Sequence, residues 1–440
     1  MSKVSMVSLG CPKNQVDAEQ MLYLLKSAGY EITSEEANAD VIIVNTCGFI
    51  ESAKAEAIEN ILEAAKYKRD GKAKAVIVTG CLAERYRDDV TEEIPEVDVC
   101  VGIGANKDIA DIVKSVLEGK SQNRYGEKSA LNLNTKRILG GPPYTAYLKI
   151  ADGCDNCCTY CAIPKIRGRL RSRKIEDIVI EAKDLAKSGV KELIIVAQDT
   201  TAYGTDIYGN PALCKLLKEL TKIDGIKWIR TLYTYPERIT DELLQLINSE
   251  EKLVKYLDIP IQHCNDRILK RMNRKSTKSE LLSLIKHIRK TVPDITIRTT
   301  LIVGFPGESE EDFAELHEFV KDMKFDRLGC FTYSAEEDTP AAEYDGQIEE
   351  QIKQDRMELI MQSQSDIMEQ KNREKVGTHT KVLIEGYDDY IKCYFGRSAA
   401  DAPEIDGKVF FTALKPLKIG DFTNVSIIDV LEYDLLGENL

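Results

Sequence analysis

The 440-residue chain contains no run of about 18 apolar residues, so we expect no membrane-spanning helix. It also lacks a recognisable secretion signal, because the apolar stretch before Cys11 is short and is interrupted by Ser5 and Ser8. Leu9-Gly10-Cys11 weakly resembles a lipoprotein cleavage site, but the stretch before it is too short to act as a signal core. These absences argue against the membrane and exported classes and predict a cytoplasmic protein.

Positive charge is also in short supply. The 60 basic residues are outnumbered by 73 acidic ones, which leaves a net charge of −13. This balance disfavours nucleic-acid binding over the whole surface and suits a basic partner better. No internal repeat or low-complexity tract stands out, and the length predicts two or three domains. The chain does contain 12 cysteines, which without a secretion signal are expected to be reduced ligands rather than disulfides.

A cysteine follows each of the three strands that we predict within residues 1–118. The strands are expected at 4–8, 40–45 and 75–79, and the cysteines are Cys11, Cys47 and Cys81. Strand carboxyl ends share one edge in an open α/β sheet, so these cysteines can converge although they are about 35 residues apart. A single small cysteine often only packs behind a strand. Three in succession favour a metal-sulfur site in an N-terminal α/β domain with an open parallel sheet.

Two helices are predicted between these strands. The first is expected at 16–28 and ends at Gly29. In the second, apolar residues recur at positions i, i+3, i+4 and i+7, which predicts one buried face. That face consists of Ile58, Ile61, Leu62 and Ala65.

Three further segments follow. The polar stretch 119–143 is predicted to be a linker. Over 144–372, six strands alternate with helical patterns and predict a parallel sheet curved into a six-fold β/α partial barrel. These strands are expected at 147–150, 192–197, 227–232, 255–259, 296–303 and 327–333. Residues 373–440 predict a small β-barrel of OB-like size. Its strands are expected at 381–385, 390–394, 409–413 and 424–431.

Cys154, Cys158 and Cys161 form a C-x3-C-x2-C pattern directly after the first strand of the predicted partial barrel. One interpretation is a four-cysteine zinc site that includes Cys157, because the segment also contains two C-x2-C pairs. These pairs are adjacent, whereas zinc sites usually separate them by about a dozen residues. The other interpretation is a four-iron cluster held by three thiolates. It leaves one iron open to a substrate and gives Cys157 no role.

The triplet after the first strand of a six-fold barrel resembles the radical S-adenosylmethionine superfamily, and the whole chain resembles its methylthiotransferases. The matching stretches are Gly10-Cys11-Pro12-Lys13-Asn14, Asn45-Thr46-Cys47, Thr79-Gly80-Cys81, Asp152-Gly153-Cys154 and Gly304-Phe305-Pro306-Gly307-Glu308. The resemblance implies two 4Fe-4S clusters and S-adenosylmethionine as cofactors. One cluster would be held by Cys154, Cys158 and Cys161, and the other by Cys11, Cys47 and Cys81. It also implies that the C-terminal barrel is TRAM-like and recognises the substrate.

Three stretches resemble the RimO-type branch of this family, which modifies a ribosomal protein. They are Asp258-Ile259-Pro260-Ile261-Gln262-His263, the paired Glu336-Glu337, and Asp401-Ala402-Pro403-Glu404-Ile405-Asp406-Gly407. Asp338 replaces the glycine that is usual in that branch, so the conformation of the turn at this position is not predicted. Charge favours the same branch independently, because residues 373–440 hold 8 basic and 12 acidic residues, a poor RNA-binding surface. The basic run at 165–174 does not discriminate, because both branches carry similar arginines there.

The resemblance implies that a methylthio group is added to the β-carbon of an aspartate of the basic small-subunit ribosomal protein twelve. The target would be the free protein or the subunit that carries it. One S-adenosylmethionine would methylate sulfur at the N-terminal cluster. A second would be cleaved at the other cluster with an electron from a donor such as flavodoxin or ferredoxin, and its radical would take hydrogen from the β-carbon. Two alternatives stay open: methylthiolation of a tRNA adenosine, and a zinc-stabilised scaffold that binds ribosomal components.

Three residues besides the cysteines are predicted to bind the cofactor. Gln198 and Asp199 end the second barrel strand, where this superfamily contacts the methionine moiety. Gly304 follows the fifth strand, where the absence of a side chain permits close backbone approach. Ordinary turn chemistry at strand ends explains the same residues equally well. His263 likewise has two interpretations, a cofactor contact or a cap of the fourth strand.

Overall fold

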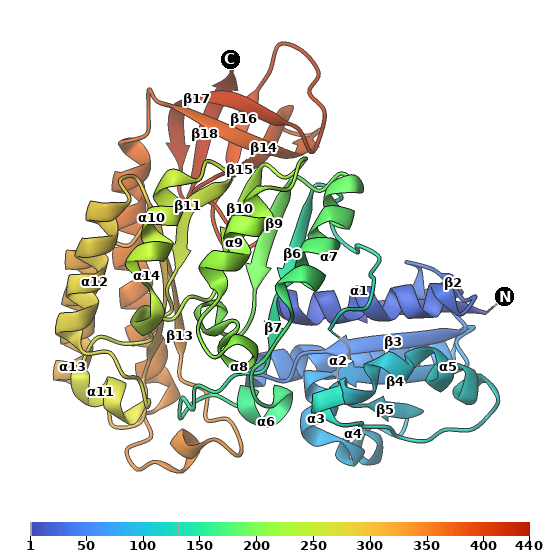
Figure 1. Cartoon of the computed structure of the whole chain (residues 1–440). Helices are drawn as coiled ribbons and strands as arrows, with labels where there is room; N and C mark the ends of the chain where they lie inside the picture. The colour runs from blue at the N-terminus through green and yellow to red at the C-terminus, as the bar shows by residue number, and fades with distance from the viewer. Residues whose placement is uncertain (1, 131–132) are drawn as a thin grey trace.

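A computed structural model of the chain describes residues 2–130 and 133–440. The small barrel lies at the top of a central curved sheet, and the N-terminal sheet with its helices lies to the lower right (Figure 1). The predicted fold class is therefore confirmed, with an open parallel sheet, a parallel-sheet core and a closed C-terminal barrel. No helix in the described part of the chain is long and apolar enough to cross a membrane.

The N-terminal sheet is parallel and has the strand order β2-β1-β3-β4-β5. Its elements are β1 (Lys3–Ser8), α1 (Pro12–Ser27), β2 (Glu31–Ile32), β3 (Val41–Thr46), α2 (Glu51–Arg69), β4 (Ala75–Gly80), α3 (Cys81–Tyr86), α4 (Asp88–Glu93), β5 (Val99–Val101) and α5 (Ile109–Leu117). The strand order reverses direction between β1 and β3. Ligands of open α/β sheets bind beyond the strand ends at such a switch point.

Two details of the predicted helices are wrong. α1 begins at Pro12 instead of residue 16, because proline is well accommodated in the first helical turn. α2 buries only part of the predicted face: Ile61 and Ala65 are buried, but Ile58 is 41% and Leu62 44% exposed. Small alanines take their place, and the buried apolar stripe consists of Ala57, Ile61, Ala64 and Ala65.

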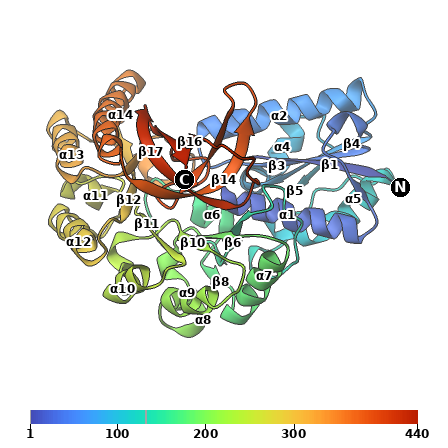
Figure 2. The ribbon, with the colours of Figure 1, turned by 90° about the horizontal axis from the view of Figure 1, so that it is seen from above.

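The central sheet has six parallel strands in the order β13-β12-β11-β10-β9-β6. All six predicted strands are confirmed to within two residues at each end. The elements are β6 (Thr145–Lys149), β7 (Ala151–Asp152), α6 (Ile163–Arg167), β8 (Arg171–Ser172), α7 (Ile175–Lys187), β9 (Glu192–Val196), α8 (Thr205–Tyr208), α9 (Leu213–Thr221), β10 (Trp228–Thr231), α10 (Asp241–Ser249), β11 (Leu253–Asp258), α11 (Asp266–Arg271), α12 (Lys278–Thr291), β12 (Thr296–Val303), α13 (Glu310–Met323) and β13 (Arg327–Thr332). Figure 2 shows the larger helices on the outer side of the curve. A large apolar core fills the layer between them and the strands.

α14 (Glu350–Arg373) packs along β13 and leads into a closed five-stranded barrel of order β14-β15-β16-β18-β17. The strands are β14 (His379–Asp388), β15 (Cys393–Ser398), β16 (Val409–Thr412), β17 (Phe422–Leu431) and β18 (Asp434–Asn439). The strand expected at 390–394 is wrong in position, because a turn with a positive φ of 55° at Lys392 precedes β15. β18 was not predicted, since its sequence DLLGEN contains no β-branched or aromatic residue.

The N-terminal unit contacts both edges of the open central sheet. On one side, Arg137 donates to Glu19 of α1 at 2.6 Å and to the carbonyl of Tyr147 in β6. On the other side, Arg85 of α3 donates to Glu336, just beyond β13, at 2.7 Å. The concave face of the central sheet is thereby enclosed between the N-terminal unit and the barrel.

Candidate metal-sulfur site

A cavity of about 460 Å³ lies between the N-terminal unit and the inner side of the central sheet. On the N-terminal side it is lined by residues that follow β1, β3 and β4. Its lining includes both predicted cysteine sets: Cys11, Cys47, Cys81, Cys154, Cys158 and Cys161. Cys157 is exposed, and its thiol donates to the carbonyl of Asp155. The structure thus brings six of the twelve cysteines into one cavity and leaves the seventh candidate outside it.

The N-terminal set gathers at the ends of three elements. Cys11 precedes the first turn of α1, Cys47 follows β3, and Cys81 is the first residue of α3. Gly10 has a φ of +86°, and a side chain at this position would approach the Cβ of Cys47 to 2.6 Å. Glycine therefore allows the loops that carry Cys11 and Cys47 to touch.

Burial and neighbouring charge act in opposite directions on these thiols. Burial raises the pKa of the Cys81 thiol to about 12, and it also raises the pKa of Cys47. Burial alone would raise the pKa of Cys11 as well, but the charges of Lys13 and Arg167 outweigh it and lower that pKa. Arg167 also donates to the Cys81 sulfur at 3.5 Å. Thiolates are the metal-binding form of cysteine, so these cations favour metal binding.

The second set lies in the loop between β7 and α6. The sulfur of Cys154 accepts the amide N–H of Asn156 at 3.4 Å, and the sulfur of Cys158 is 3.3 Å from the hydroxyl of Tyr235. Burial raises the pKa of Cys154 to about 11 and that of Cys161 to about 12. Among the described residues, no cation lowers the pKa of these two thiols in the way that Lys13 and Arg167 lower that of Cys11. Their deprotonation therefore depends on what they bind.

A buried ion network joins the two halves of the site. The guanidinium of Arg167 donates to Asp17 of α1 at 2.9 Å and to Asp152 of β7 at 3.0 Å. Lys149 pairs with the same two carboxylates. Burial alone would raise the pKa of Asp152, but Arg167 and Lys149 hold it well below its ordinary range. Removal of one member would leave a buried charge without a partner. The network therefore holds α1 in place against the loop that carries Cys154.

The predicted cofactor-binding residues fall into different places. Gln198 lines the cavity and donates to Asp152 at 3.0 Å, and its buried Oε1 has no hydrogen-bond partner among the residues that the structure describes. Asp199 is buried beside the cavity and accepts hydrogen bonds from Asn156 and Arg238. It therefore supports the Cys154 loop.

Gly304 and His263 are not among the lining residues. The N–H of Gly304 donates to Glu308, and a side chain at Gly304 would meet Lys353 at 2.3 Å. The close approach at this glycine is thus made by Lys353. The Nδ1 of His263 accepts the N–H of Asn265, so Nε2 carries the proton and lies 3.5 Å from Glu308.

Several lining residues were missed by the sequence analysis. Lys13, Tyr233, Arg274 and Arg298 bring polar groups to the cavity, and all three parts of the molecule supply apolar wall residues. These are Phe49 from the N-terminal unit, Phe331 from β13 and Ile405 from the loop between β15 and β16. Lys13 and Ile405 stood within the stretches that carried the resemblance. The other residues had no recognisable pattern.

The position of Cys157 argues against the four-cysteine zinc site. That site needs all four thiolates around one ion, but Cys157 is exposed and does not line the cavity.

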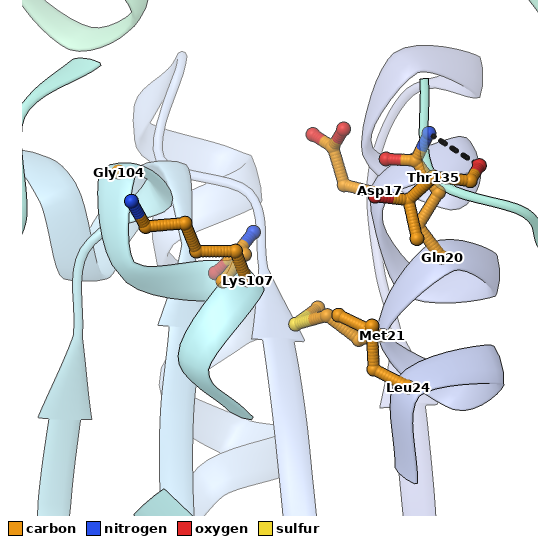
Figure 3. Close-up of a pocket in the computed structure, with 8 residues that line it drawn as sticks. Asp17, Gln20, Met21, Leu24, Gly104, Lys107 and Thr135 are labelled. Atoms are coloured by element: carbon orange, nitrogen blue, oxygen red, sulfur yellow. Dashed lines mark hydrogen bonds between the residues drawn. The ribbon is translucent and has the colours of Figure 1, made fainter. Parts of the chain in front are cut away.

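A second cavity, between α1 and the 3-10 helix Ile103–Asp108, measures only about 20 Å³ (Figure 3). Its lining includes Asp17, Met21, Lys107 and Gln20, whose side-chain amide donates a hydrogen bond to the carbonyl of Thr135. It has room for about one water.

Three family models match successive parts of the chain. They are described as the uncharacterized protein family UPF0004 at residues 3–102, the radical SAM superfamily at 148–320 and the TRAM domain at 376–440. Among solved structures, the radical S-adenosylmethionine methyltransferase TsrM from Kitasatospora setae is similar in fold. Its TM-score is 0.59 at 13% identity, over 78% of this chain and 77% of that one.

Curated relatives match over the full length. A protein from Acetivibrio thermocellus is 51% identical over 99% of this chain and 98% of its own length. A protein from Clostridium botulinum is 53% identical over 99% of this chain and 97% of its own. One from Geobacter sulfurreducens is 49% identical over 99% and 98%. All three carry the name ribosomal protein uS12 methylthiotransferase RimO.

Proposed function

The chain belongs to the RimO family of ribosomal protein uS12 methylthiotransferases, and from this membership we propose that it adds a methylthio group to the β-carbon of an aspartate of uS12. The observation that carries the proposal is an identity of about one half over the full length of several curated relatives. The three family models support the same enzyme class, because a radical SAM core stands between the two other domains.

The donor set of the cavity fits the cofactors that this reaction requires. We propose Cys154, Cys158 and Cys161 as ligands of one 4Fe-4S cluster and Cys11, Cys47 and Cys81 as ligands of the other. Soft thiolates are the usual ligands of iron-sulfur clusters, and three thiolates leave one of four irons without a cysteine. When bound, the clusters and S-adenosylmethionine supply the electron, the radical chemistry and the methylthio group that an unactivated carbon needs.

The residues of this chain would bind the cofactor, orient the substrate and exclude water. The unpartnered Oε1 of Gln198 can accept a hydrogen bond from S-adenosylmethionine, which supports its predicted role. Asp199 would act through Asn156 on the Cys154 loop. The Gly304 contact stays a prediction from the sequence, because Gly304 does not line the cavity. Phe331 and Ile405 are 51% and 49% exposed in the free chain, so a substrate bound against them and Phe49 would complete the exclusion of water from the reactive carbon.

The acidic barrel supports a protein substrate over tRNA. Residues 373–440 hold 8 basic and 12 acidic residues, whereas an RNA-binding domain presents basic groups to phosphates. The full-length relatives share the uS12 name, which supports the same choice. We further propose a cytoplasmic location, because reduced thiols are needed, and an electron donor such as flavodoxin or ferredoxin.

Anaerobic reconstitution and mass spectrometry would test the proposal. The reconstituted protein is expected to hold about eight irons per chain. Supplied with S-adenosylmethionine, a sulfide source and a reductant, it should add methylthio mass to purified uS12 and leave tRNA offered in parallel unchanged. Modification of tRNA alone, or of neither substrate by a protein with full iron content, would refute the proposed function.

A further inference from the structure

Lys13 is a buried cation without a carboxylate partner in the described part of the chain, and its charge acts on the thiol of Cys11. It stands in the first turn of α1, is 7% exposed and lines the large cavity. None of the ion pairs among the described residues includes its ammonium group. Buried charges are normally paired, because desolvation of an isolated charge costs several kcal/mol. A lysine without a carboxylate partner in the wall of a binding cavity is therefore a candidate receptor for a carboxylate.

The aromatic ring of Tyr233 holds this ammonium group in place. The Nζ of Lys13 lies 3.6 Å from the ring centroid, a close cation–π contact between α1 and the end of β10. Tyr233 has a positive φ of 60°, a strained backbone conformation for a tyrosine. The N–H of Tyr233 donates to Asp258 at 3.0 Å, which holds the strained residue in position. A residue with a strained backbone, Tyr233, thus places its aromatic ring against the ammonium group of Lys13.

The other cations of the cavity are already engaged. Arg298 pairs with Asp258 at 3.1 Å, and Arg167 belongs to the buried ion network. Arg274 lies over the ring of Tyr235 and donates to the carbonyl of Pro260. Tyr235 contacts Cys158, so Arg274 belongs to the side of the cavity where the S-adenosylmethionine cluster is proposed. Lys13 belongs to the opposite side, two residues from Cys11.

We propose that Lys13 receives the side-chain carboxylate of the substrate aspartate. The inference rests on the proposed function, and it adds the residue that recognises the carboxylate. The β-carbon that gains sulfur is bonded to that carboxyl carbon. A fixed cation beside the N-terminal cysteine set would therefore orient the β-carbon toward the sulfur that it receives. An asparagine or a nucleobase at the same place would leave the ammonium without a counter-charge, so the lysine also selects the substrate.

The test compares binding of two substrates to reconstituted enzyme in the absence of reductant, so that no turnover occurs. The first is native uS12. The second carries asparagine in place of the target aspartate, which mass spectrometry of the modified product identifies. The enzymes are wild type, Lys13→Gln, Lys13→Arg and the control Lys26→Gln, an exposed lysine near the end of the same helix. Iron content is measured for each.

Lys13→Gln is expected to weaken binding of native uS12 by about 10- to 100-fold, the value of a charge-assisted contact. It should leave binding of the asparagine form unchanged, and Lys13→Arg should recover part of the loss. Lys26→Gln should bind both forms as wild type does. The inference is overturned if Lys13→Gln, compared at equal iron content, weakens both forms equally or neither, or if its only effect is loss of iron or weaker S-adenosylmethionine binding. If wild-type enzyme with full iron produces no methylthio-uS12, the proposed function itself has failed.

Discussion

Cys157 and Cys158 are adjacent in the sequence, but only Cys158 faces the cavity. Replacing Cys158 by serine removes one proposed ligand and leaves the N-terminal set intact. We expect the iron content of reconstituted protein to fall from about eight to about four per chain. Cys157→Ser provides the matched control and should retain about eight irons. A colorimetric iron assay with visible absorption distinguishes the two variants, and equal iron contents would contradict the ligand assignment.

At the residue scale, the cysteines could be predicted because the type of ligand and its spacing are local features of the sequence. Arg167 could not, because its partner Asp17 lies 150 residues away and only the fold brings them together. The strained backbone of Tyr233 is equally unreadable, since tyrosine has no preference for positive φ. Local chemistry was therefore predictable, and the residues that hold it in place were not.

At the element scale, the loop after β13 braces the segment that carries Cys47. Arg85 of α3 donates to Glu336 at 2.7 Å and to the carbonyl of Gly48 at 3.0 Å. Glu336→Gln leaves buried Arg85 without its carboxylate, so we expect the free energy of unfolding to fall by about 3–5 kcal/mol. The N-terminal cluster should also release its iron faster to a chelator. Urea titration and chelation kinetics measure the two effects.

Glu337→Gln is the control for that experiment. Glu337 is exposed and bonds the hydroxyl of Tyr86, so the substitution should change stability by less than about 1 kcal/mol. Similar losses in the two variants would show that Glu336 does not support the cysteine segment through Arg85.

The buried face of α2 differs from the predicted one by a rotation of the helix, and core substitutions can test it. Ile61 is fully buried, whereas Ile58 is 41% exposed. Ile61→Ala should lower the free energy of unfolding by about 2–5 kcal/mol through lost burial and a new cavity. Ile58→Ala should cost less than about 1 kcal/mol, because most surface substitutions have small effects. Equal losses of unfolding free energy in urea titrations would instead support the buried face that was predicted from the sequence.

Strands were predicted more accurately in the buried central sheet than in the partly exposed barrel. β9 is buried along its whole length and is almost entirely apolar, and β12 consists mostly of β-branched residues, so the positions of both strands were found. The barrel strands β17 and β18 are partly exposed along much of their length, and β18 contains an interior glycine. Hydropathy is weak there, because closure of the barrel supplies the pairing that the local sequence does not specify.

At the scale of the whole molecule, the sequence indicated three parts but not how they enclose one cavity. The N-terminal unit reaches both edges of the central sheet through Glu19 and Arg85. The barrel sends Ile405 into the cavity wall. These contacts join residues more than 100 positions apart, and no local pattern encodes them.

The barrel is attached to the central sheet by buried ion pairs that acid should break. Glu192 of β9 pairs with Arg397 of β15 at 2.6 Å and with Arg230 at 3.1 Å. Burial alone would raise the pKa of Glu192, but Arg397 and Arg230 outweigh it and lower the pKa below the ordinary 4.5. The pair therefore stabilises fully above about pH 4.5, and this stabilisation is lost as the pH falls through the native pKa.

Glu192→Gln removes this titration, so its cost should depend on pH. At pH 7 the variant is expected to lose about 3–5 kcal/mol of unfolding free energy, because two buried arginines lose their carboxylate. The difference from wild type should narrow steadily as the pH falls below 4.5, where wild-type Glu192 also becomes neutral. The single tryptophan, Trp228, reports the transition, because its ring lies 4.7 Å from that of Phe422 in the barrel. Glu438→Gln, an exposed change on the barrel, should match wild type throughout. If the difference in unfolding free energy stays constant between pH 7 and pH 3, the charge of Glu192 does not stabilise the attachment of the barrel. In that case protonation of Glu192 would remove no stabilising free energy.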